Sequence, residues 1–306
     1  MNPTKSLRFE IVPGEAGERI DKIVVRHAGA LGRRRTAELF AAGAVRVGGR
    51  RAKKGDRARE GDVVTIEEPA RDIEPEPGAP LDVRLETDTV VVASKPAGQP
   101  TAPIHPGETH TLAQALLGRY PEMAGIGYRP REPGLVHRLD TQTSGLVVAA
   151  RTGVAFDHLR RALGEGRLDK RYFAVVEEAG LPESGVIERP LGPDPGNPRR
   201  VAVVSKATAR DKQARTEFRT LRICGRWALL EVHVRHAYRH QIRAHLASEG
   251  HPIAGDALYG GPSVPGLGTR HALHACYVAW AGDDVVGPFA VEDPLPEDLA
   301  ALLGAS

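Results

Sequence analysis

HRLDTQTSG, at residues His137–Gly145, runs directly into the apolar segment LVVAA at residues 146–150. The apolar run contains valines and has the length of a strand, which predicts a buried strand. We therefore expect Asp140 in the loop that leads into this strand, between a basic pair and a turn of small hydroxyl residues. Loops held by a rigid scaffold often carry catalytic residues. Judged from these residues alone, Arg138 and Asp140 could equally form a surface ion pair of little consequence.

On both sides of this segment, short β-type runs alternate with a few helical stretches. Strands are expected at residues 83–85, 90–94, 146–150, 172–177 and 228–234, and helices at residues 111–117, 154–163 and 239–248. The strands and helices lack the regular alternation of a parallel βαβ sheet. Residues 81–303 are therefore expected to form an α+β domain on a mixed, largely antiparallel sheet.

A polar, proline-rich stretch at residues 69–80 precedes this domain. It contains Pro69, Pro75, Pro77, Gly78 and Pro80. Prolines stiffen an irregular chain, so the composition predicts a semi-rigid linker between two domains.

Residues 15–68 have the pattern of a second, smaller domain. Helices are expected at residues 19–25 and 33–40, and short strands at 44–47 and 62–66. Residues 19–59 contain thirteen Lys and Arg against three Asp and Glu, a net charge of +10, whereas the rest of the chain carries −7. Charge segregated in this way indicates an anionic polymer as partner, with a solvated basic face as the alternative.

The composition excludes several other classes of protein. With 41% hydrophobic and 26% charged residues and no long apolar run, the chain is typical of soluble proteins without membrane association. The first ten residues lack the apolar core of a signal peptide, so we expect a cytoplasmic location. Cys224 and Cys276 are far apart, which argues against a disulfide framework or a thiolate zinc site, and we expect both to pack as small hydrophobes.

His137–Gly145 resembles the signature of the RluA family of RNA pseudouridine synthases, which reads His-Arg-Leu-Asp, two variable residues, then Thr-Ser-Gly. Three further blocks resemble those of the family, in the order in which the family uses them. They are Val90–Gly98 followed by His105–Gly107, the Lys-x-Tyr of Leu168–Tyr172, and His240–Leu246 followed by Gly250–Gly260. The resemblance spans nearly the whole chain and implies the pseudouridine synthase fold.

The resemblance also implies a catalytic site made of Asp140, Tyr172 and Arg243. Asp140 would be the essential carboxylate, acting as a nucleophile at the sugar or the base, or as a partner for positive charge on the sugar. Arg243 would pair with this carboxylate and keep it ionised. Tyr172 would lie against the uracil ring and assist a late proton removal, although a core tyrosine on a strand is the alternative.

Other residues of the larger domain are expected at the RNA. His137 and Arg138 would lie at the mouth of the pocket, with Arg138 filling the space that a flipped nucleotide leaves. A structural hydrogen-bonding role is the alternative for His137. Lys95 and Arg239 are also expected to contact RNA. The family usually has Gly-Arg-Thr before His-Gln-Ile-Arg, whereas this chain has Ala237-Tyr238-Arg239. The usual Arg is either replaced by Tyr238 or displaced to Arg239, which leaves the backbone path and the RNA contacts there open.

The smaller domain resembles the RNA-binding domain named for ribosomal small-subunit protein four, hereafter the S4-like domain. Phosphate contacts of such a domain give affinity and orientation with little choice of sequence. The residues expected to meet phosphate are Arg33, Arg34, Arg35, Arg46, Arg50, Arg51, Lys53 and Lys54.

A metal site is the first rival interpretation. His236, His240 and His245 are close in sequence, as in some zinc hydrolases. However, no His-Glu-x-x-His frame occurs, and the arginines interspersed among these histidines would repel a cation. We therefore expect no metal.

The sequence leads to the prediction of a monomeric isomerase that needs no cofactor and converts uridine to pseudouridine in RNA. Ribosomal RNA of the large subunit is the favoured target, because a basic N-terminal module is more typical of family members that act there. Transfer RNA is the alternative target. A non-catalytic RNA-binding or ribosome-assembly factor of the same fold is the rival function, but binding alone does not require Asp140, Tyr172 and Arg243 together.

Overall fold

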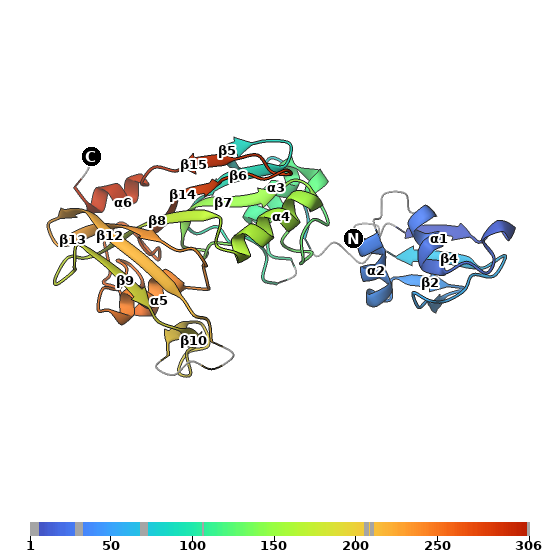
Figure 1. Cartoon of the computed structure of the whole chain (residues 1–306), viewed down its shortest axis with the longest axis horizontal. Coiled ribbons are helices and arrows are strands. Elements are labelled where there is room, and N and C mark those ends of the chain that lie inside the picture. Colours follow the sequence, from blue (N-terminus) through green and yellow to red (C-terminus); the bar gives the residue numbers. More distant parts are fainter. Residues whose placement is uncertain are drawn as a thin grey trace. The chain divides into compact units, whose positions relative to one another are not determined.

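The computed structural model describes residues 6–27, 33–67, 73–105, 107–204, 208 and 211–304 (Figure 1). The chain divides into two compact units, Met1–Asp72 and Ile73–Ser306, each with its own hydrophobic core. None of the helices in the described ranges is both long enough and apolar enough to span a bilayer.

The smaller unit combines two helices with a four-stranded antiparallel sheet. The sheet has the order β1-β4-β2-β3, where β1 is Ser6–Glu10, β4 is Val63–Glu67, β2 is Val45–Val47 and β3 is Arg50–Arg51. A 3-10 turn, η1, spans Pro13–Glu15, and the helices are α1 at Ile20–His27 and α2 at Arg33–Ala42. Ile20, Ile23 and Val24 of α1 are fully buried, because their spacing puts them on one face of the helix.

The second part of the predicted linker at residues 69–80 packs on the larger unit. Residues 68–72 lie outside the described ranges. From Ile73 onward the chain packs on the larger unit: the Ile73 side chain is 7% exposed and contributes to a core with residues of α3, Leu112–Arg119. The backbone N–H of Glu76 also donates a hydrogen bond to the carbonyl of Gln114 at 3.0 Å. Residues 73–80 therefore belong to the larger unit, because burial of the apolar Ile73 fixes them there.

The larger unit is built on a nine-stranded sheet, which confirms the predicted α+β class. Eight strands follow the order β5-β6-β7-β14-β8-β13-β12-β9, and β15 pairs with β14. All pairs are antiparallel except β7 with β14, so the sheet is mixed and largely antiparallel. The bounds are β5 Asp82–Glu86, β6 Val90–Lys95, β7 Ser144–Ala150, β8 Asp169–Glu177, β9 Ser184–Glu188, β12 Arg215–Cys224, β13 Trp227–His233, β14 Leu273–Trp280 and β15 Phe289–Glu292.

Helices and one small hairpin complete the larger unit (Figure 1). The helices are α3, α4 at Gly153–Gly164, α5 at Gln241–Ser248 and α6 at Glu297–Leu302, with 3-10 turns η2 at Pro121–Met123 and η3 at Ala257–Tyr259. The hairpin pairs β10, Leu191–Pro193, with β11, Val201–Val203. Each of the expected helices and strands of this domain is present with bounds shifted by a few residues, whereas β9 to β12, β14, β15 and α6 were not predicted. Cys276 is buried on β14 and Cys224 is half-buried at the end of β12.

Strand β7 is buried on both of its faces. Alternate residues Leu146, Val148 and Ala150 pack in one core with Phe156 and Leu159 of α4. Val147 and Ala149 point to the opposite face, where α3 packs. Helices on both faces explain why the sequence here is a continuous apolar run, and they hold the loop before β7 on a rigid base.

Gly145 is required where β7 meets β14. Its φ is +108°, and an added Cβ would lie 2.2 Å from the carbonyl oxygen of Ala275 on the paired strand. We expect Gly145→Ala to lower the free energy of unfolding by about 3 kcal/mol or more, because the new methyl group meets backbone that cannot move away. Denaturant unfolding measures the effect.

Gly153→Ala is the matched control for this substitution. Gly153 opens α4, and nothing lies within 4 Å of its added Cβ. This variant should keep its stability or gain up to roughly 1 kcal/mol. Equal stabilities of the two variants would contradict the close approach at Gly145.

Candidate active site

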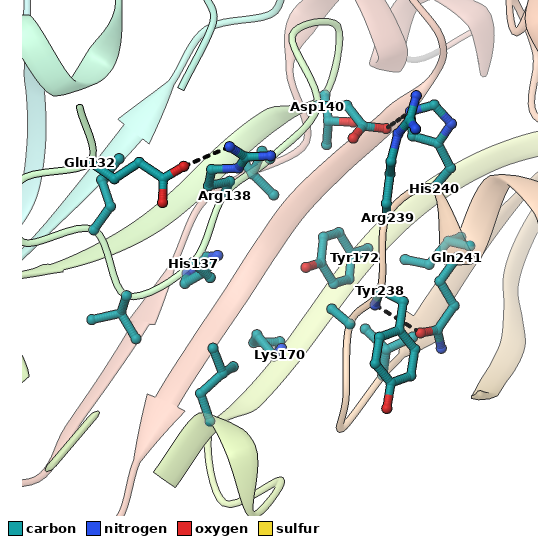
Figure 2. Close-up of a pocket in the computed structure, with 18 of the residues that line it drawn as sticks. Glu132, His137, Arg138, Asp140, Lys170, Tyr172, Tyr238, Arg239, His240 and Gln241 are labelled. Carbon is teal, nitrogen blue, oxygen red and sulfur yellow. Dashed lines mark hydrogen bonds and ion pairs between the residues drawn. The ribbon is translucent and has the colours of Figure 1, made fainter. Parts of the chain in front are cut away.

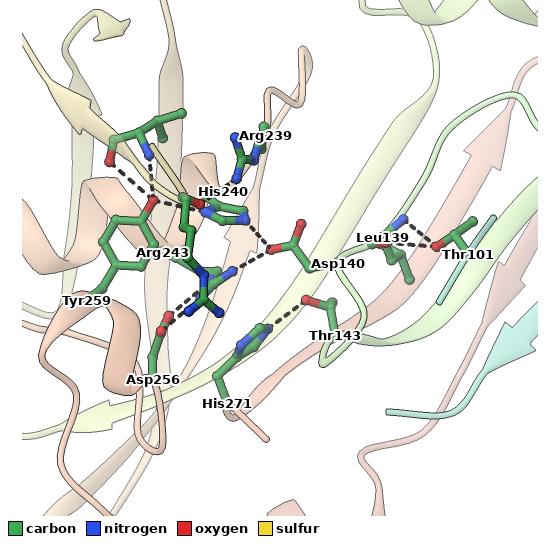
Figure 3. A network of polar contacts seen from close by, with 12 residues as sticks. Thr101, Leu139, Asp140, Thr143, Arg239, His240, Arg243, Asp256, Tyr259 and His271 are labelled. Carbon is green, nitrogen blue, oxygen red and sulfur yellow. Dashed lines mark hydrogen bonds and ion pairs between the residues drawn. The ribbon is translucent and has the colours of Figure 1, made fainter. Parts of the chain in front are cut away.

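The loop that carries Asp140 is held from both sides by hydrogen bonds. Thr101 Oγ1 donates to the carbonyl of Leu139 at 2.8 Å, and the backbone N–H of Leu139 donates back to Thr101 Oγ1 at 3.2 Å. After the aspartate, Thr143 Oγ1 lies 2.7 Å from His271 Nε2 (Figure 3). Asp140 thus occupies a fixed position at the entrance to β7, as the sequence predicted.

Arg243 on α5 holds the carboxylate of Asp140. Its Nη1 donates to Asp140 Oδ2 at 2.8 Å, while Nε and Nη2 donate to the two oxygens of Asp256 at 2.7 and 2.9 Å (Figure 3). The guanidinium also lies 5.0 Å from the ring centroid of Tyr259. Asp256 therefore orients Arg243 in a bidentate pair and leaves one edge of the guanidinium for Asp140.

The charges around Asp140 favour its ionised form. Burial acts to raise the pKa of Asp140, but the charges of His240 and Arg243 and the Arg243 hydrogen bond outweigh burial, and the pKa is lowered. Burial lowers the pKa of His240 itself to about 4, so His240 is neutral near pH 7. At neutral pH the permanent charge beside Asp140 is therefore that of Arg243, and the Asp140 side chain remains 27% exposed for a substrate.

Asp140 and Tyr172 line one pocket of about 540 Å³ (Figure 2). Tyr172 is buried on β8, and burial raises its pKa, with the charge of Asp140 acting in the same direction. The phenol is therefore neutral at physiological pH. A second pocket of about 720 Å³ shares Arg138, Asp140, Arg239 and Arg243 with the first. The two pockets adjoin at these shared residues, and together they are large enough for a nucleotide.

Arg138 and Arg239 lie at the rim of this space. Arg138 is exposed and its Nη1 donates to Glu132 Oε1 at 2.7 Å. Arg239 is exposed, lines both pockets and donates from Nη2 to the carbonyl of Arg199. Both cations are accessible to an anionic ligand.

His137 lines the first pocket, but its ring is engaged by the fold. Its Nε2 accepts a hydrogen bond from the backbone N–H of Val148 at 3.2 Å, and burial lowers its pKa to about 3. The ring is therefore neutral. Of the two roles considered for His137, this geometry favours the structural hydrogen bond over an ionic contact with RNA.

The prediction that Lys95 contacts RNA is wrong, because the fold buries this side chain. Its side chain is 0% exposed, and Nζ donates to the carbonyls of Pro96, Gln99 and Thr141 at 2.9, 2.8 and 3.1 Å. A buried ammonium with three carbonyl partners cannot reach a polyanion. Lys95 instead ties the end of β6 to the residue after Asp140.

The departure at Ala237-Tyr238-Arg239 leaves the start of α5 intact. The backbone N–H of Tyr238 donates to Gln241 Oε1 at 3.1 Å, and His240 adopts a left-handed conformation with φ 53° just before the helix. His240 Nδ1 lies 3.0 Å from the Tyr259 hydroxyl. Tyr238 and Arg239 both line the first pocket, so a cation is present there together with the aromatic ring.

The three histidines considered for a metal site have separate partners. His236 Nε2 lies 3.2 Å from the carbonyl of Gly164, whereas His245 contacts Thr216 Oγ1 at 2.8 Å and the carbonyl of Arg189 at 3.0 Å. His240 faces Tyr259 and Asp140. The rival interpretation as one three-histidine site is not supported by this arrangement.

The basic residues of the smaller unit are described in part. Arg46, Arg50, Arg51, Lys53 and Lys54 are exposed around β2, β3 and the turn that follows β3. Arg51 Nη2 also donates to the carbonyl of Ala41 at 2.7 Å. The side chains of Arg33, Arg34 and Arg35 lie outside the described part of the structure.

The sequence prediction assigned no role to Asp256, His271 or Lys170. Asp256 and Lys170 lie within the blocks Gly250–Gly260 and Leu168–Tyr172 that carry the resemblance, so their position in those blocks was a usable signal. His271 lies in no such block, and only the fold brings it to Thr143.

Comparisons with known proteins identify the family to which the chain is similar. A family model described as RNA pseudouridylate synthase matches residues 89–248, which include Asp140, Tyr172 and Arg243. The chain is 34% identical over 302 residues to a Neisseria meningitidis serogroup B protein named ribosomal large subunit pseudouridine synthase D, covering 94% of this chain and 78% of that protein. It is 37% identical over 305 residues to an uncharacterized RNA pseudouridine synthase of Chloroflexus aurantiacus, covering 96% of this chain and 91% of that protein.

A solved structure shares the fold. Human RNA pseudouridylate synthase domain containing 1 superposes with a TM-score of 0.57 at 23% identity, over 75% of this chain and 90% of that chain. The family match and the two relatives extend across the pocket that holds Asp140 and well beyond it. The chain therefore belongs to the RNA pseudouridylate synthase family, whose members are isomerases that act on RNA, and within it to the RluA type that its signature predicted.

Proposed function

We propose that this protein converts specific uridines to pseudouridine in large-subunit ribosomal RNA, with Asp140 as the catalytic carboxylate. The observation that carries the proposal is the Asp140–Arg243 pair, joined at 2.8 Å at the wall of a pocket of nucleotide size. Arg243 keeps Asp140 ionised, and the exposed part of the carboxylate faces the space that a flipped uridine would fill.

The reaction requires three events at one site. The bond from the sugar C1′ to the ring nitrogen N1 breaks, the uracil turns while it stays bound, and a bond from C1′ to the ring carbon C5 forms. A proton then leaves C5 and another is taken up at N1, so that the product is an isomer of the substrate. Asp140 provides the ionised carboxylate for the sugar or the base.

Tyr172 and Arg138 support this chemistry in different ways. The flat ring of Tyr172 contacts the uracil without a directional bond that would oppose its rotation. Because burial raises the pKa of Tyr172, the neutral phenol assists removal of the C5 proton as a hydrogen-bonding group and not as the base that accepts it. Arg138 at the rim braces the space that the flipped nucleotide vacates, and Arg239 meets the RNA backbone beside it.

Two observations support ribosomal RNA as the substrate. Several relatives carry the name ribosomal large subunit pseudouridine synthase D. The smaller unit contains the two helices followed by short strands on which the S4-like prediction rests, with a further strand, β1, before them that was not predicted, and it exposes basic side chains. We propose that this unit binds RNA phosphates and that residues 68–72 connect it to the catalytic domain.

Mapping of pseudouridine tests the function directly. RNA from cells with and without the gene is compared, in separate ribosomal and transfer RNA fractions. Loss of one or a few sites in large-subunit ribosomal RNA supports the proposal. Loss confined to transfer RNA would redirect the substrate, and loss of none would favour a non-catalytic RNA-binding factor.

Neutralising the exposed basic residues of the smaller unit should weaken RNA binding more than catalysis. The variant replaces Arg46, Arg50, Arg51, Lys53 and Lys54 with glutamine. If all five contact phosphate, the slope of log affinity against log salt falls by about 4, because each contact contributes about 0.7 to 0.9. We expect at least tenfold weaker binding near physiological salt and an almost unchanged kcat at saturating RNA.

The control neutralises two other exposed cations of the same unit, Arg8 on β1 and Lys22 on α1. It should leave the salt dependence nearly unchanged. If the slope of log affinity against log salt is identical in both variants, the phosphate contacts proposed for β2, β3 and the following turn are contradicted.

A further inference from the structure

Lys170 is a buried cation without a partner in the wall of the catalytic pocket. Its side chain is 2% exposed, and among the described residues Nζ has no hydrogen-bond partner. Lys170 and Tyr172 lie two residues apart on β8, so both point to the same face, roughly 7 Å from each other along the strand. Figure 2 shows Tyr172 between Lys170 and Asp140 in this view of the pocket.

The contrast with Lys95 shows that this ammonium is unusual within the chain. Lys95 is equally buried, but its ammonium donates hydrogen bonds to three carbonyl oxygens. Within the described ranges Lys170 Nζ has no such partner, and a buried ammonium left unpaired is costly. Proteins retain such costs mostly where a ligand or a reaction uses the group.

The other charged groups of the pocket are already committed. Asp140 pairs with Arg243, and Glu132 pairs with Arg138. Arg160 Nη1 donates to the carbonyl of Val136 at 2.6 Å. His137 is neutral and accepts from the backbone of Val148. Among the described residues these groups leave Lys170 free to donate to a ligand that enters the pocket.

We propose that Lys170 is a further catalytic residue that donates a hydrogen bond to a carbonyl oxygen of the uracil and stabilises the negative charge that the ring acquires. The inference rests on the proposed function. When the C1′–N1 bond breaks, its electron pair stays on the ring and spreads over N1, O2 and O4. A preorganised cation in a dry wall is suited to hold this charge.

The symmetry of the detached ring lets one lysine serve both halves of the reaction. A half-turn about the axis through N3 and C6 exchanges N1 with C5 and, at the same time, O2 with O4. A donor that meets one carbonyl oxygen before the rotation therefore meets the other oxygen afterwards. Lys170 can hold the ring in both orientations, while Asp140 stays on the side of the sugar.

Rim residues are better placed than Lys170 to meet RNA phosphates. Arg138 and Arg239 are exposed, whereas Lys170 lies in the buried part of the pocket. A phosphate contact would contribute to RNA affinity, and a contact with the developing ring charge would contribute to kcat. Measurements of RNA affinity and of kcat therefore distinguish a phosphate contact of Lys170 from a contact with the uracil ring.

Lys170→Met removes the charge and keeps an unbranched apolar chain of similar length in the buried wall. Measured on an RNA that the wild-type protein isomerises, kcat should fall about 100- to 1,000-fold, the scale for loss of one donor to a developing anion. The Kd for RNA should change less than threefold. Lys212→Met, at an exposed lysine of the same unit, is the matched control and should retain wild-type kinetics.

The pH profile provides a readout that a structural role would not move. Burial lowers the pKa of Lys170 to about 8, so kcat/KM of the wild-type protein should fall as the pH rises through about 8 and the ammonium loses its proton. Lys170→Met should lack this decline. Lys170→Arg, which stays charged, should shift the decline to higher pH. Ionisation of the uridine itself affects all three proteins equally, so a difference between their pH profiles comes from residue 170.

RNA with 2-thiouridine or 4-thiouridine at the target tests the contact itself, because sulfur is a weaker acceptor than oxygen. Both substitutions should slow the wild-type protein about tenfold or more, and neither should slow Lys170→Met further. Unchanged kcat in Lys170→Met, or a loss confined to Kd as a phosphate contact would give, would overturn the proposal for Lys170. A wild-type protein that modifies no RNA would instead overturn the proposed function.

Discussion

Asp140→Asn should abolish pseudouridine formation while the protein still folds and binds RNA. The amide keeps the shape of the side chain but removes the negative charge and the nucleophilic oxygen that the reaction needs. We expect kcat to fall at least about 10⁴-fold, as it does when the central group of other enzymes is removed. The measurement is pseudouridine formed per enzyme on the mapped RNA, under single-turnover conditions.

The structure indicates that this substitution leaves the surroundings in place. Arg243 keeps its bidentate pair with Asp256, so no buried cation is left alone. RNA affinity and the unfolding temperature should stay close to wild type. Asp157→Asn, an identical substitution at an exposed position of α4, is the control and should be fully active. Substantial turnover by Asp140→Asn would refute the role of Asp140.

Arg243→Met should cost both activity and stability. The Arg243 side chain is 7% exposed, and its removal leaves the carboxylates of Asp140 and Asp256 without their cation. Removing one partner of a buried ion pair typically lowers the free energy of unfolding by about 3–5 kcal/mol. Activity should fall at least about 100-fold, because burial then raises the pKa of Asp140 and reduces its ionised fraction.

The pH dependence separates these two effects of Arg243. In the wild-type protein the pKa of Asp140 is lowered, so its contribution to stability is present above the usual aspartate value of about 3.9 and is lost as the pH falls through the lower folded-state pKa. Wild-type activity should thus show no loss from Asp140 between neutral pH and about 4. In Arg243→Met, residual activity should decline on acidification at a higher pH.

A double variant and a control complete this experiment. Arg243→Met combined with Asp256→Asn removes the more deeply buried of the two stranded charges and should recover most of the lost stability, but not the activity. Arg222→Met, at an exposed arginine of β12, should change neither quantity. Recovery of activity in the double variant would mean that Arg243 acts only through folding.

The sequence predicted the loop and strand around Asp140 because both depend on local patterns. A polar turn before an apolar run of strand length specifies its own structure, and β7 is found at Ser144–Ala150. The same holds for α4 and α5, whose apolar spacing is helical. By contrast, β10 and β11 are three residues long and lack a clear alternation of buried and exposed residues. β9 alternates only weakly and β12 only in its first half, so their patterns were too short to be recognised.

The roles of the individual lysines could not be predicted in the same way. Lys95 lies at the end of β6 and Lys170 near the start of β8, and both belong to blocks that resemble the family. Each side chain carries a positive charge that could contact RNA. Lys95 donates hydrogen bonds to three carbonyls. Lys170 lies in the pocket wall, and its Nζ has no hydrogen-bond partner among the described residues. Burial and hydrogen bonding depend on segments far away in the chain, such as the carbonyl of Thr141 for Lys95.

The amino-acid sequence by itself determined the α+β class, the family and the segment that carries Asp140, because local periodicity and a nearly continuous set of motifs encode them. Tertiary structure alone decided which charges meet. Asp140 and Arg243 are 103 positions apart, and Asp256 fixes Arg243 from a third segment. Electrostatic stabilisation of a buried carboxylate depends on distances of a few ångström and on the exclusion of water, and both arise only when the sheet and α5 pack together.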